Sequence, residues 1–364
     1  YLAFFCGLME LLIISGASEK LAKKLSPFFS KIFPSVPKNH ESVSYMTLNF
    51  AANFLGLDSA ATPFGLKAMQ SLQELNPEKD KASDAQIMFM CLHAAGLTLI
   101  PTSIIGYRAA ANAANPADVM LPCIITSFIG TIAAMLIVGI RQKINFLSAT
   151  LIVGLMTVIS AIAGLLFYIN RLDLVEKNFF TSNLSGLMLI AIIGITLIYA
   201  FTKESKFVEQ KTTIFDAFVS GAKNGLTTGV TIFPYVMGML VAISFFRNSG
   251  LFELMSDGIS FAFSNIGVSK EITDSLPVAM LRPFSSSGSR GFMLDAMSTF
   301  GVDSLTGRLS SIFQCSAETT FYVIAVYFGS INVKNTRYTL GIMLLVDLIC
   351  VITAIAVASW FFVK

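Results

Sequence analysis

The fold of this chain is decided by residues 42–70, SVSYMTLNFAANFLGLDSAATPFGLKAMQ. The segment starts as an apolar helix, but positions 53–65 hold two glycines, a proline, a carboxylate and two hydroxyl groups. Backbone that leaves a helix exposes N–H and C=O groups, and each costs several kcal/mol when it stays unpaired in hydrocarbon. We therefore expect a broken helix or a re-entrant hairpin, enclosed by protein or lining a polar cavity, with a binding site at its tip.

The composition is that of an integral membrane protein. Mean hydropathy is +0.72, and 54% of the residues are hydrophobic while 13% are charged. Soluble domains carry about 25% charged residues. Apolar runs that approach or exceed the ~18–20 residues needed to cross a bilayer occur at 119–140, 146–169, 184–201, 230–246 and 340–363. The net charge of +3 is small and indicates no nucleic-acid partner.

We therefore expect an all-α, polytopic membrane fold, with the lipid bilayer as a partner. Spanning helices are expected at 1–17, 85–107, 118–140, 146–169, 184–202, 226–247, 309–331 and 338–362, with broken or re-entrant segments near 42–70 and 276–298. The chain is expected to cross the membrane many times. Because the sequence begins inside an apolar segment, we expect it to start part-way into a longer chain.

Known catalytic and metal-binding motifs do not occur. The five cysteines stand far apart without a Cys-x-x-Cys pair, so they predict neither a disulfide nor a metal centre. The sequence has no HExxH, no G-x-S-x-G and no nucleotide-binding P-loop. We expect no cofactor, and uphill transport would then draw on a partner or on a coupling ion, Na⁺ or H⁺.

The second half of the chain mirrors the first. The broken segment 47–69 corresponds to 281–297, LRPFSSSGSRGFMLDAM, which is also rich in Gly, Ser and Pro. The interrupted apolar helix that follows the first broken segment corresponds to 314–329 in the same order. We expect two repeats, and the expected domains are 1–140, the linking region 141–216 with two plain membrane helices and a charged linker, and 217–364.

Loop charges indicate that the two repeats have opposite orientations. Residues 20–38 carry five lysines, which the positive-inside rule places in the cytoplasm. The corresponding residues 248–274 are mainly acidic and are expected outside. Inverted-topology repeats place a substrate site near the middle of the membrane, between two discontinuous elements.

Several motifs resemble known families. Residues 56–76, GLDSAATPFGLKAMQSLQELN, resemble the signature of the spore maturation protein A family. Where that family has an Asn-Thr-Ser-Ser-like run before Leu-Ile-Pro-Thr, this chain has His93–Gly96. The second half resembles the spore maturation protein B family at FVSGAKNGL (218–226), LRPFSSSGSRG (281–291), GVDSLTGRL (301–309), SAETTFYVIAVYFGS (316–330) and KNTRY (334–338).

The resemblance implies a fusion of the two families. Both belong to the nucleoside-recognition, or Gate, group, which is similar to the gate regions of concentrative nucleoside transporters and of the ferrous iron transporter B. The resemblance therefore implies a role in membrane transport or permeation, and a location in the bacterial inner (cytoplasmic) membrane. Clustered Cys, Met and His ligands for iron do not occur in the sequence, which weakens the analogy with the iron transporter.

Polar residues in the broken segments are the candidates for a solute site. Asp58 and Glu318 are carboxylates in apolar surroundings, where a charge marks a pathway, a proton relay or an ion pair, and Arg282 is the expected partner of Glu318. Structural hydrogen bonds between helices are the alternative role of each hydroxyl and amide group. The expected substrate-binding residues are Asn49, Asn53, Asp58, Thr62, Arg282, Ser285, Ser286, Ser289, Gln314, Glu318, Thr319 and Thr320.

We expect a transporter or permeation protein for a small polar solute, nucleoside-like or another small organic molecule, bound between the two broken segments. Tyr322 and Tyr327 are candidates for stacking on a ring and His93 for a proton relay, with packing in the core as the alternative. The other functions considered are a non-transporting envelope or spore-maturation scaffold, and an intramembrane enzyme for an envelope precursor that uses Asp58 and Glu318. A homo-oligomer is a further expected partnership.

Overall fold

The computed structural model of the chain describes residues 2–37, 40–54, 58–146, 148–169, 171–172, 174–250, 254, 258 and 269–363. Regular structure in these ranges is helical, apart from one isolated β-bridge between Lys81 and Asn335. The all-α fold class is therefore confirmed for the described part of the chain.

The helices follow one another in three groups. The first group is α1 (Leu2–Ile14), α2 (Ala17–Ile32), α3 (Glu41–Phe54), α4 (Asp58–Leu75), α5 (Asp84–Ala94), α6 (Thr102–Ala110) and α7 (Met120–Arg141). The middle group is α8 (Ala149–Ile169), α9 (Leu174–Thr202) and the short α10 (Glu204–Glu209). The last group is α11 (Ile214–Asn248), α13 (Lys270–Leu281), α14 (Ser286–Phe300), α15 (Leu305–Cys315), α16 (Thr320–Gly329) and α17 (Thr339–Phe362).

Serine caps start three of the helices next to the interruptions. Ser83 forms a capping box with Gln86 at the start of α5. Ser285 accepts a hydrogen bond from the Gly288 N–H at the start of α14, and Ser304 accepts one from the Gly307 N–H at the start of α15. A serine side chain at this position pairs one of the backbone N–H groups that a new helix leaves without a partner.

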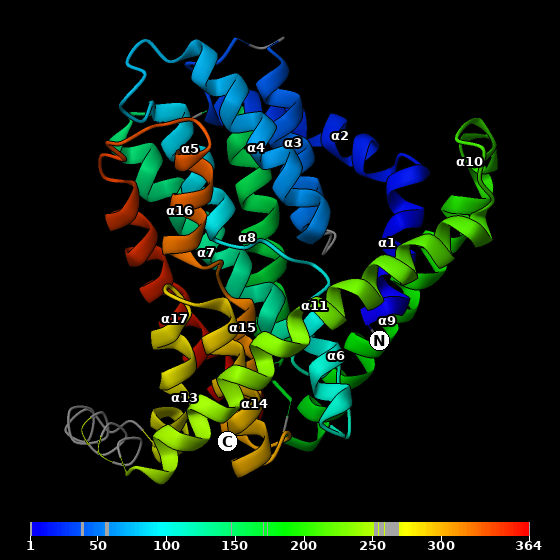
Figure 1. Ribbon diagram of the computed structural model, residues 1–364, viewed down its shortest axis with the longest axis vertical. Helices are drawn as coiled ribbons and strands as arrows, with labels where there is room; N and C mark the ends of the chain where they lie inside the picture. The colour runs from blue at the N-terminus through cyan, green and yellow to red at the C-terminus, as the bar shows by residue number, and fades with distance from the viewer. Residues whose placement is uncertain are drawn as a thin grey trace.

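Two helical hairpins, α3–α4 and α13–α14, enter the molecule from opposite ends (Figure 1). α3 and α4 run from the upper end of the view to its middle and back, whereas α13 and α14 approach the middle from the lower end. α5 and α16 lie in the upper half, and α6 and α15 lie in the lower half. The long α11 crosses in front of these helices and packs against α1.

A hydrophobic core joins the first and last groups of helices. Phe89 of α5, Tyr327 of α16 and Met343 of α17 belong to one buried cluster. α7 packs along α17, so the long apolar helix of one half covers that of the other. The interrupted helices are anchored to this pair, because α5 and α15 each pack against both α7 and α17.

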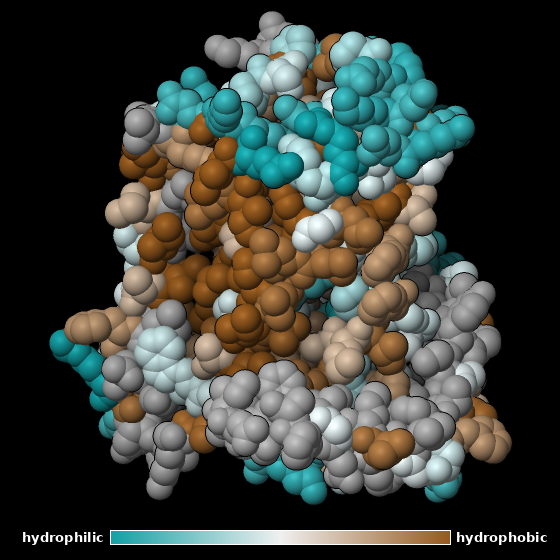
Figure 2. All heavy atoms as spheres, turned by 90° about the vertical axis from the view of Figure 1, so that its left-hand side faces the viewer, coloured by the Kyte–Doolittle hydropathy of each residue, from teal (hydrophilic) through white to brown (hydrophobic). Residues whose placement is uncertain are grey.

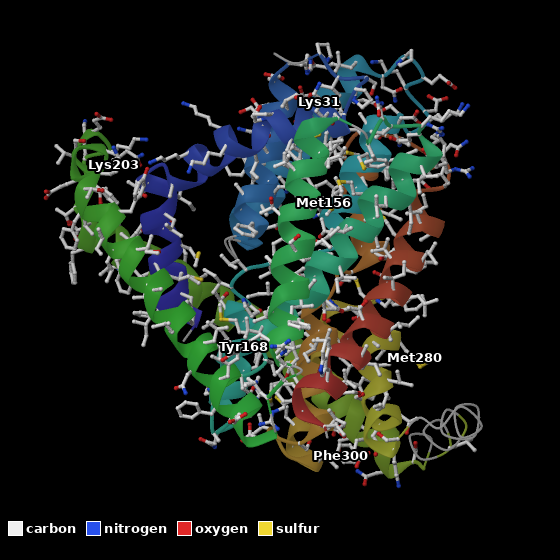
Figure 3. The ribbon with its side chains drawn as sticks, turned by 180° about the vertical axis from the view of Figure 1, so that it is seen from behind. Lys31, Met156, Tyr168, Lys203, Met280 and Phe300 are labelled. Atoms are coloured by element: carbon white, nitrogen blue, oxygen red, sulfur yellow. The ribbon has the colours of Figure 1, made fainter. Side chains whose placement is uncertain are left out.

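The outer surface is apolar at mid-height. The face shown in Figure 2 is hydrophilic at its upper end and hydrophobic over its middle. Large apolar side chains are also exposed on the side seen in Figure 3, where Met156 of α8 is 55% exposed. Lys31 and Lys203 lie toward one end of the molecule and Phe300 toward the other. Such a band suits hydrocarbon between two polar ends.

Two of the described helices are long and apolar enough to cross a bilayer, α7 (Met120–Arg141) and α17 (Thr339–Phe362). Shorter apolar helical stretches occur at Ala3–Ile14, Leu151–Leu165 and Ile190–Thr202. Four of these five stretches fall within spans that the sequence predicts, and α7 extends one residue beyond the predicted span 118–140.

The spans expected at 85–107 and 309–331 are both interrupted, as the sequence indicates. α5 and α6 are separated by residues 95–101, and α15 and α16 by residues 316–319. Gly96 has a φ of 61°, a left-handed conformation that suits glycine and ends α5. Pro101, which has no N–H group, then precedes α6 as its N-cap. The expected span 226–247 is part of the longer helix α11.

Candidate functional site: a polar cavity between helix breaks

The two interrupted helices cross at their breaks. The Glu318 N–H, between α15 and α16, donates to the Ala94 carbonyl at the end of α5 at 2.8 Å. Gly96 lies at this crossing, where an added Cβ atom would meet the Cα atom of Ala317 at 3.4 Å, an ordinary van der Waals distance. The backbone groups that the breaks release are thus partly paired with the other half of the chain.

Each hairpin is bonded to the interrupted helix of its own half. The Leu99 N–H donates to the carbonyl of Phe54, the last residue of α3, at 2.8 Å. In the second half, the Phe321 N–H donates to the carbonyl of Pro283, between α13 and α14, at 3.0 Å. The residues between α3 and α4, 55–57, lie outside the described part of the chain. These bonds bring the hairpins and the interrupted helices to one place.

A cavity of about 180 Å³ lies at this place. We call it the central cavity. Both halves of the chain contribute to its walls, and several of the expected residues line it. The polar side chains in its lining are Asn53, Thr62, His93, Thr98, Thr102, Ser103, Tyr107, Arg282, Ser286, Arg290, Gln314, Glu318, Tyr322 and Tyr327.

Arg282 and Glu318 face each other in the central cavity, as expected. Arg282 Nη2 lies 3.9 Å from Glu318 Oε2, and Arg282 Nη1 donates to Thr319 Oγ1 at 2.9 Å. The Arg282 side chain is 11% exposed and that of Glu318 is 39% exposed. Because 3.9 Å is longer than a hydrogen-bonded ion pair, the carboxylate attracts the guanidinium without occupying its donors.

The first half contributes a histidine held by two amides. Asn49 Nδ2 donates to the Ala61 carbonyl at 2.7 Å, and Asn49 Oδ1 lies 3.1 Å from His93 Nδ1. Asn53 Nδ2 lies 3.0 Å from the same ring nitrogen, which donates to Asn49 in one tautomer of His93 and accepts from Asn53 in the other. The His93 ring also packs against Tyr327, with 4.9 Å between ring centroids. His93 is therefore a fixed part of the cavity wall.

Several expected residues hold the walls together and are absent from the lining. Ser289 donates to the Val278 carbonyl and to Gln314 Oε1, at 2.8 and 2.6 Å. Thr320 donates to Asp347 Oδ2 at 2.6 Å, and Ser285 caps α14. Asn49 contacts His93, and Thr319 accepts a hydrogen bond from Arg282. Both therefore support a lining residue without lining the cavity. The side chain of Asp58, the first residue of α4, lies outside the described part of the chain.

The sequence interpretation missed several residues of the lining, among them Arg290, Tyr107, Thr98 and Ser103. Arg290 stands four residues after Ser286, so both side chains occupy one face of α14. The guanidinium carbon of Arg290 lies 5.6 Å from the centroid of the Tyr107 ring. The helical spacing within the 281–291 motif was a usable signal for Arg290. Tyr107 comes from α6, and its place at the cavity depends on the tertiary structure.

A buried ion cluster joins the halves at the lower end of Figure 1. Arg108 is fully buried, and its Nη2 lies 2.8 Å from Asp118 and 3.0 Å from Asp303. Arg108 Nη1 donates to the Val302 carbonyl, and Arg308 Nε donates to Asp118 at 2.8 Å. We call these residues the lower cluster. They connect the α6–α7 region with the α14–α15 loop and α15.

A second set of contacts joins the halves at the upper end. Arg337 Nη1 lies 2.6 Å from Asp84 Oδ1, in a half-exposed pair between the start of α17 and the start of α5. Backbone bonds connect the same loops, since the Ala82 N–H donates to the Asn335 carbonyl at 2.9 Å. We call this the upper cluster. The central cavity thus lies between two cross-half contacts, one near each end of the molecule.

The fold and the cavity define a helical protein in which two broken hairpins and two interrupted helices surround a polar site. Residues 1–111 and 230–334 match the family model Gate, which is described as nucleoside recognition. This chain belongs to the Gate family.

Two relatives from Bacillus subtilis (strain 168) match different parts of the chain. Spore maturation protein B is 38% identical over 179 residues, which are 49% of this chain and 95% of that protein. Spore maturation protein A is 38% identical over 136 residues, which are 37% of this chain and 69% of that protein. The chain is thus similar to a fusion of the two. No solved structure matches it.

The family also supports a location in a membrane. Gate proteins and the spore maturation proteins are membrane proteins, and α7 and α17 have the length and hydropathy of membrane-spanning helices. The names of the family and of the two relatives denote no enzymatic activity.

Proposed function

We propose that this chain is a multi-pass protein of the bacterial cytoplasmic membrane that lets a small polar solute, nucleoside-like or another small organic molecule, cross through the central cavity. The observation that carries the proposal is the lining of that cavity, to which the hairpins and interrupted helices of both halves contribute polar side chains. Non-helical backbone at membrane depth is tolerated where it lines such a cavity. The family description, nucleoside recognition, supports a solute site.

The proposed architecture is a pair of inverted repeats, 1–140 and 217–364, connected by 141–216. Three features support it: the hairpins enter from opposite ends, each hairpin makes the same kind of backbone bond to its interrupted helix, and loop charges differ between the halves. Transporters built this way expose a central site to each side in turn by moving one repeat against the other.

In this proposal the lower and upper clusters close the two ends of the central cavity. Opening the upper cluster separates α17 from α5, and opening the lower cluster separates α15 from α6 and α7. The protein has no resident cofactor in this scheme. A Na⁺ or H⁺ gradient, or a partner protein, supplies the energy for any uphill movement.

The test is flux through liposomes that contain the purified protein. A panel of nucleosides, bases and small organic acids is offered to the native protein and to Ser286→Phe, which places a ring in the cavity lining. Ser160→Phe is the matched control, because Ser160 is exposed on α8 away from the cavity. We expect at least one solute to cross with the native protein and with Ser160→Phe, and to be blocked by Ser286→Phe.

Two results would contradict the proposal. One is that no solute of the panel crosses faster than it does in protein-free liposomes, which would favour a non-transporting scaffold in spore maturation. The other is equal flux through the native protein and Ser286→Phe, which would place the permeation path outside the central cavity. Conversion of an envelope precursor instead of its transport would revive the enzyme hypothesis.

A further inference from the structure

We infer that the central cavity selects solutes that carry an anionic group, a phosphate or a carboxylate, and that Arg282 and Arg290 bind that group. This inference rests on the proposed function, since it names the chemical class of the solute for the same cavity. Four observations support it: the charges of the lining, the unused donors of the arginines, the position of a helix N-terminus and the cavity volume.

Among the residues whose side chains the structure describes, the charged side chains of the lining are Arg282, Arg290 and Glu318. With His93 counted as neutral, two positive charges face one negative charge, which leaves one positive charge in excess. Glu318 lies beside Arg282, and no described residue forms an ion pair with Arg290, whose guanidinium lies over the Tyr107 ring. The other nearby carboxylate, Asp347, stands outside the lining and accepts a hydrogen bond from Thr320. An anionic solute would balance the excess charge.

Arg282 retains donors that an anion can use. Its Nε atom is buried and has no hydrogen-bond partner among the described residues. Nη2 is 3.9 Å from Glu318, too far for a hydrogen bond, and Nη1 donates to the Thr319 hydroxyl. An unpaired buried donor is unfavourable, and the planar guanidinium matches the paired oxygen atoms of a carboxylate or phosphate.

The backbone also contributes positive electrostatic potential to the central cavity. α14, which is fifteen residues long, begins at Ser286 in the cavity lining. The N-terminus of a helix presents unpaired N–H groups and a partial positive charge, both of which favour an anion. Arg282 and Arg290 flank this N-terminus, one at the end of α13 and the other one turn into α14.

The volume limits the size of what the cavity holds. Pockets for drug-sized ligands measure about 300–1,000 Å³, whereas the central cavity measures about 180 Å³. It therefore suits inorganic phosphate, a short carboxylic acid, or the anionic end of a larger solute. Phosphate and carboxylate share the chemistry that the arginines recognise, so the experiment includes both.

The experiment is calorimetric titration of the purified, detergent-solubilised full chain with inorganic phosphate, with succinate and with uridine as a neutral probe. We expect phosphate or succinate to bind, and Arg290→Gln to weaken that binding by roughly tenfold to a hundredfold, as for the loss of a charge-assisted hydrogen bond. Arg290→Lys keeps the charge and is expected to retain part of the affinity. Arg171→Gln, which removes an exposed arginine at the end of α8, is expected to bind like the native protein.

Glu318→Gln tests the inference in the opposite direction. It removes the carboxylate that competes for Arg282, so anion binding is expected to become several-fold tighter. A residue that only supports the structure would not give this gain. Gel filtration and melting temperature show that each variant is folded, and Arg290→Lys separates a loss of charge from a loss of structure.

The outcomes separate this inference from the proposed function. The anion assignment is overturned if neither phosphate nor succinate binds, or if Arg290→Gln and Arg171→Gln bind the anion equally well. If uridine crosses the liposome membrane while neither anion binds, the transport proposal stands and the anion assignment falls. If an anion binds in an Arg290-dependent manner and no solute crosses, the assignment stands and the transport proposal falls.

Discussion

Glycine positions decide how closely the cavity wall can pack. Gly65 of α4 lies against Tyr327 of α16, and a Cβ atom at Gly65 would be 2.5 Å from Tyr327 Cε1 and 2.9 Å from Asn49 Nδ2. Both neighbours belong to the wall, since Tyr327 lines the central cavity and Asn49 holds His93. The missing side chain of Gly65 therefore lets α4 and α16 come together behind the site.

Gly65→Ala is expected to destabilise the protein by about 1–3 kcal/mol, as overpacking a dense interior does. It should also reduce solute flux, because Tyr327 and Asn49 must move. The matched control is Gly164→Ala in α8, where a Cβ atom would have no neighbour within 4 Å. Melting temperature and liposome flux measure the two effects. Equal melting temperatures for the two variants would show that α4 and α16 are less tightly packed than the structure has them.

The elements at the lower end are joined by charge rather than by apolar contact. Arg108 of α6 has no exposed side-chain surface and pairs with Asp118 and Asp303, and Arg308 of α15 completes the lower cluster. Burying such charges is favourable only when each one is paired. The cluster therefore behaves as a unit, and removal of one member leaves an uncompensated charge.

Arg108→Met is expected to lower the free energy of unfolding by about 3–5 kcal/mol, the usual effect of breaking a buried ion pair. Lys81→Met is the control, because its pair with Glu78 is exposed and is expected to contribute at most about 1 kcal/mol. Denaturation of the detergent-solubilised variants measures both. A loss no greater than that of the control would mean that the lower cluster is solvated or open in solution.

The face of the molecule in Figure 2 has a hydrophilic upper end and an apolar middle, and Lys31 and Phe300 lie toward opposite ends in Figure 3, which leads to a topology prediction. Single cysteines at Lys31 and at Thr299, in a background without the native cysteines, should be labelled from opposite sides of the membrane by an impermeant reagent. The Lys31 side is expected to be cytoplasmic, because its region carries the excess of lysines. Labelling of both positions from one side would contradict the inverted repeat.

Local sequence was sufficient for the helical class and for the positions of the breaks. Hydropathy over long runs predicts helices suited to a membrane, because their length is set by the bilayer. Gly, Pro and clustered Ser at 281–291 predict the break between α13 and α14. Gly has a freer backbone, Pro lacks an N–H group, and Ser side chains compete for backbone hydrogen bonds, so each disfavours a continuous helix. The pairing of Arg282 with Glu318 followed from the same reasoning, because each charge would be costly alone.

The tertiary structure decided which polar residues line the cavity and which hold its walls. Ser286 and Ser289 look alike in sequence, yet Ser286 lines the cavity and Ser289 is bonded to Val278 and Gln314. The crossing of the interrupted helices rests on the bond from Glu318 to Ala94, residues far apart in the chain. Hydropathy and helical period describe neighbours along the chain, whereas a site between two halves depends on contacts that close only when those halves pack together.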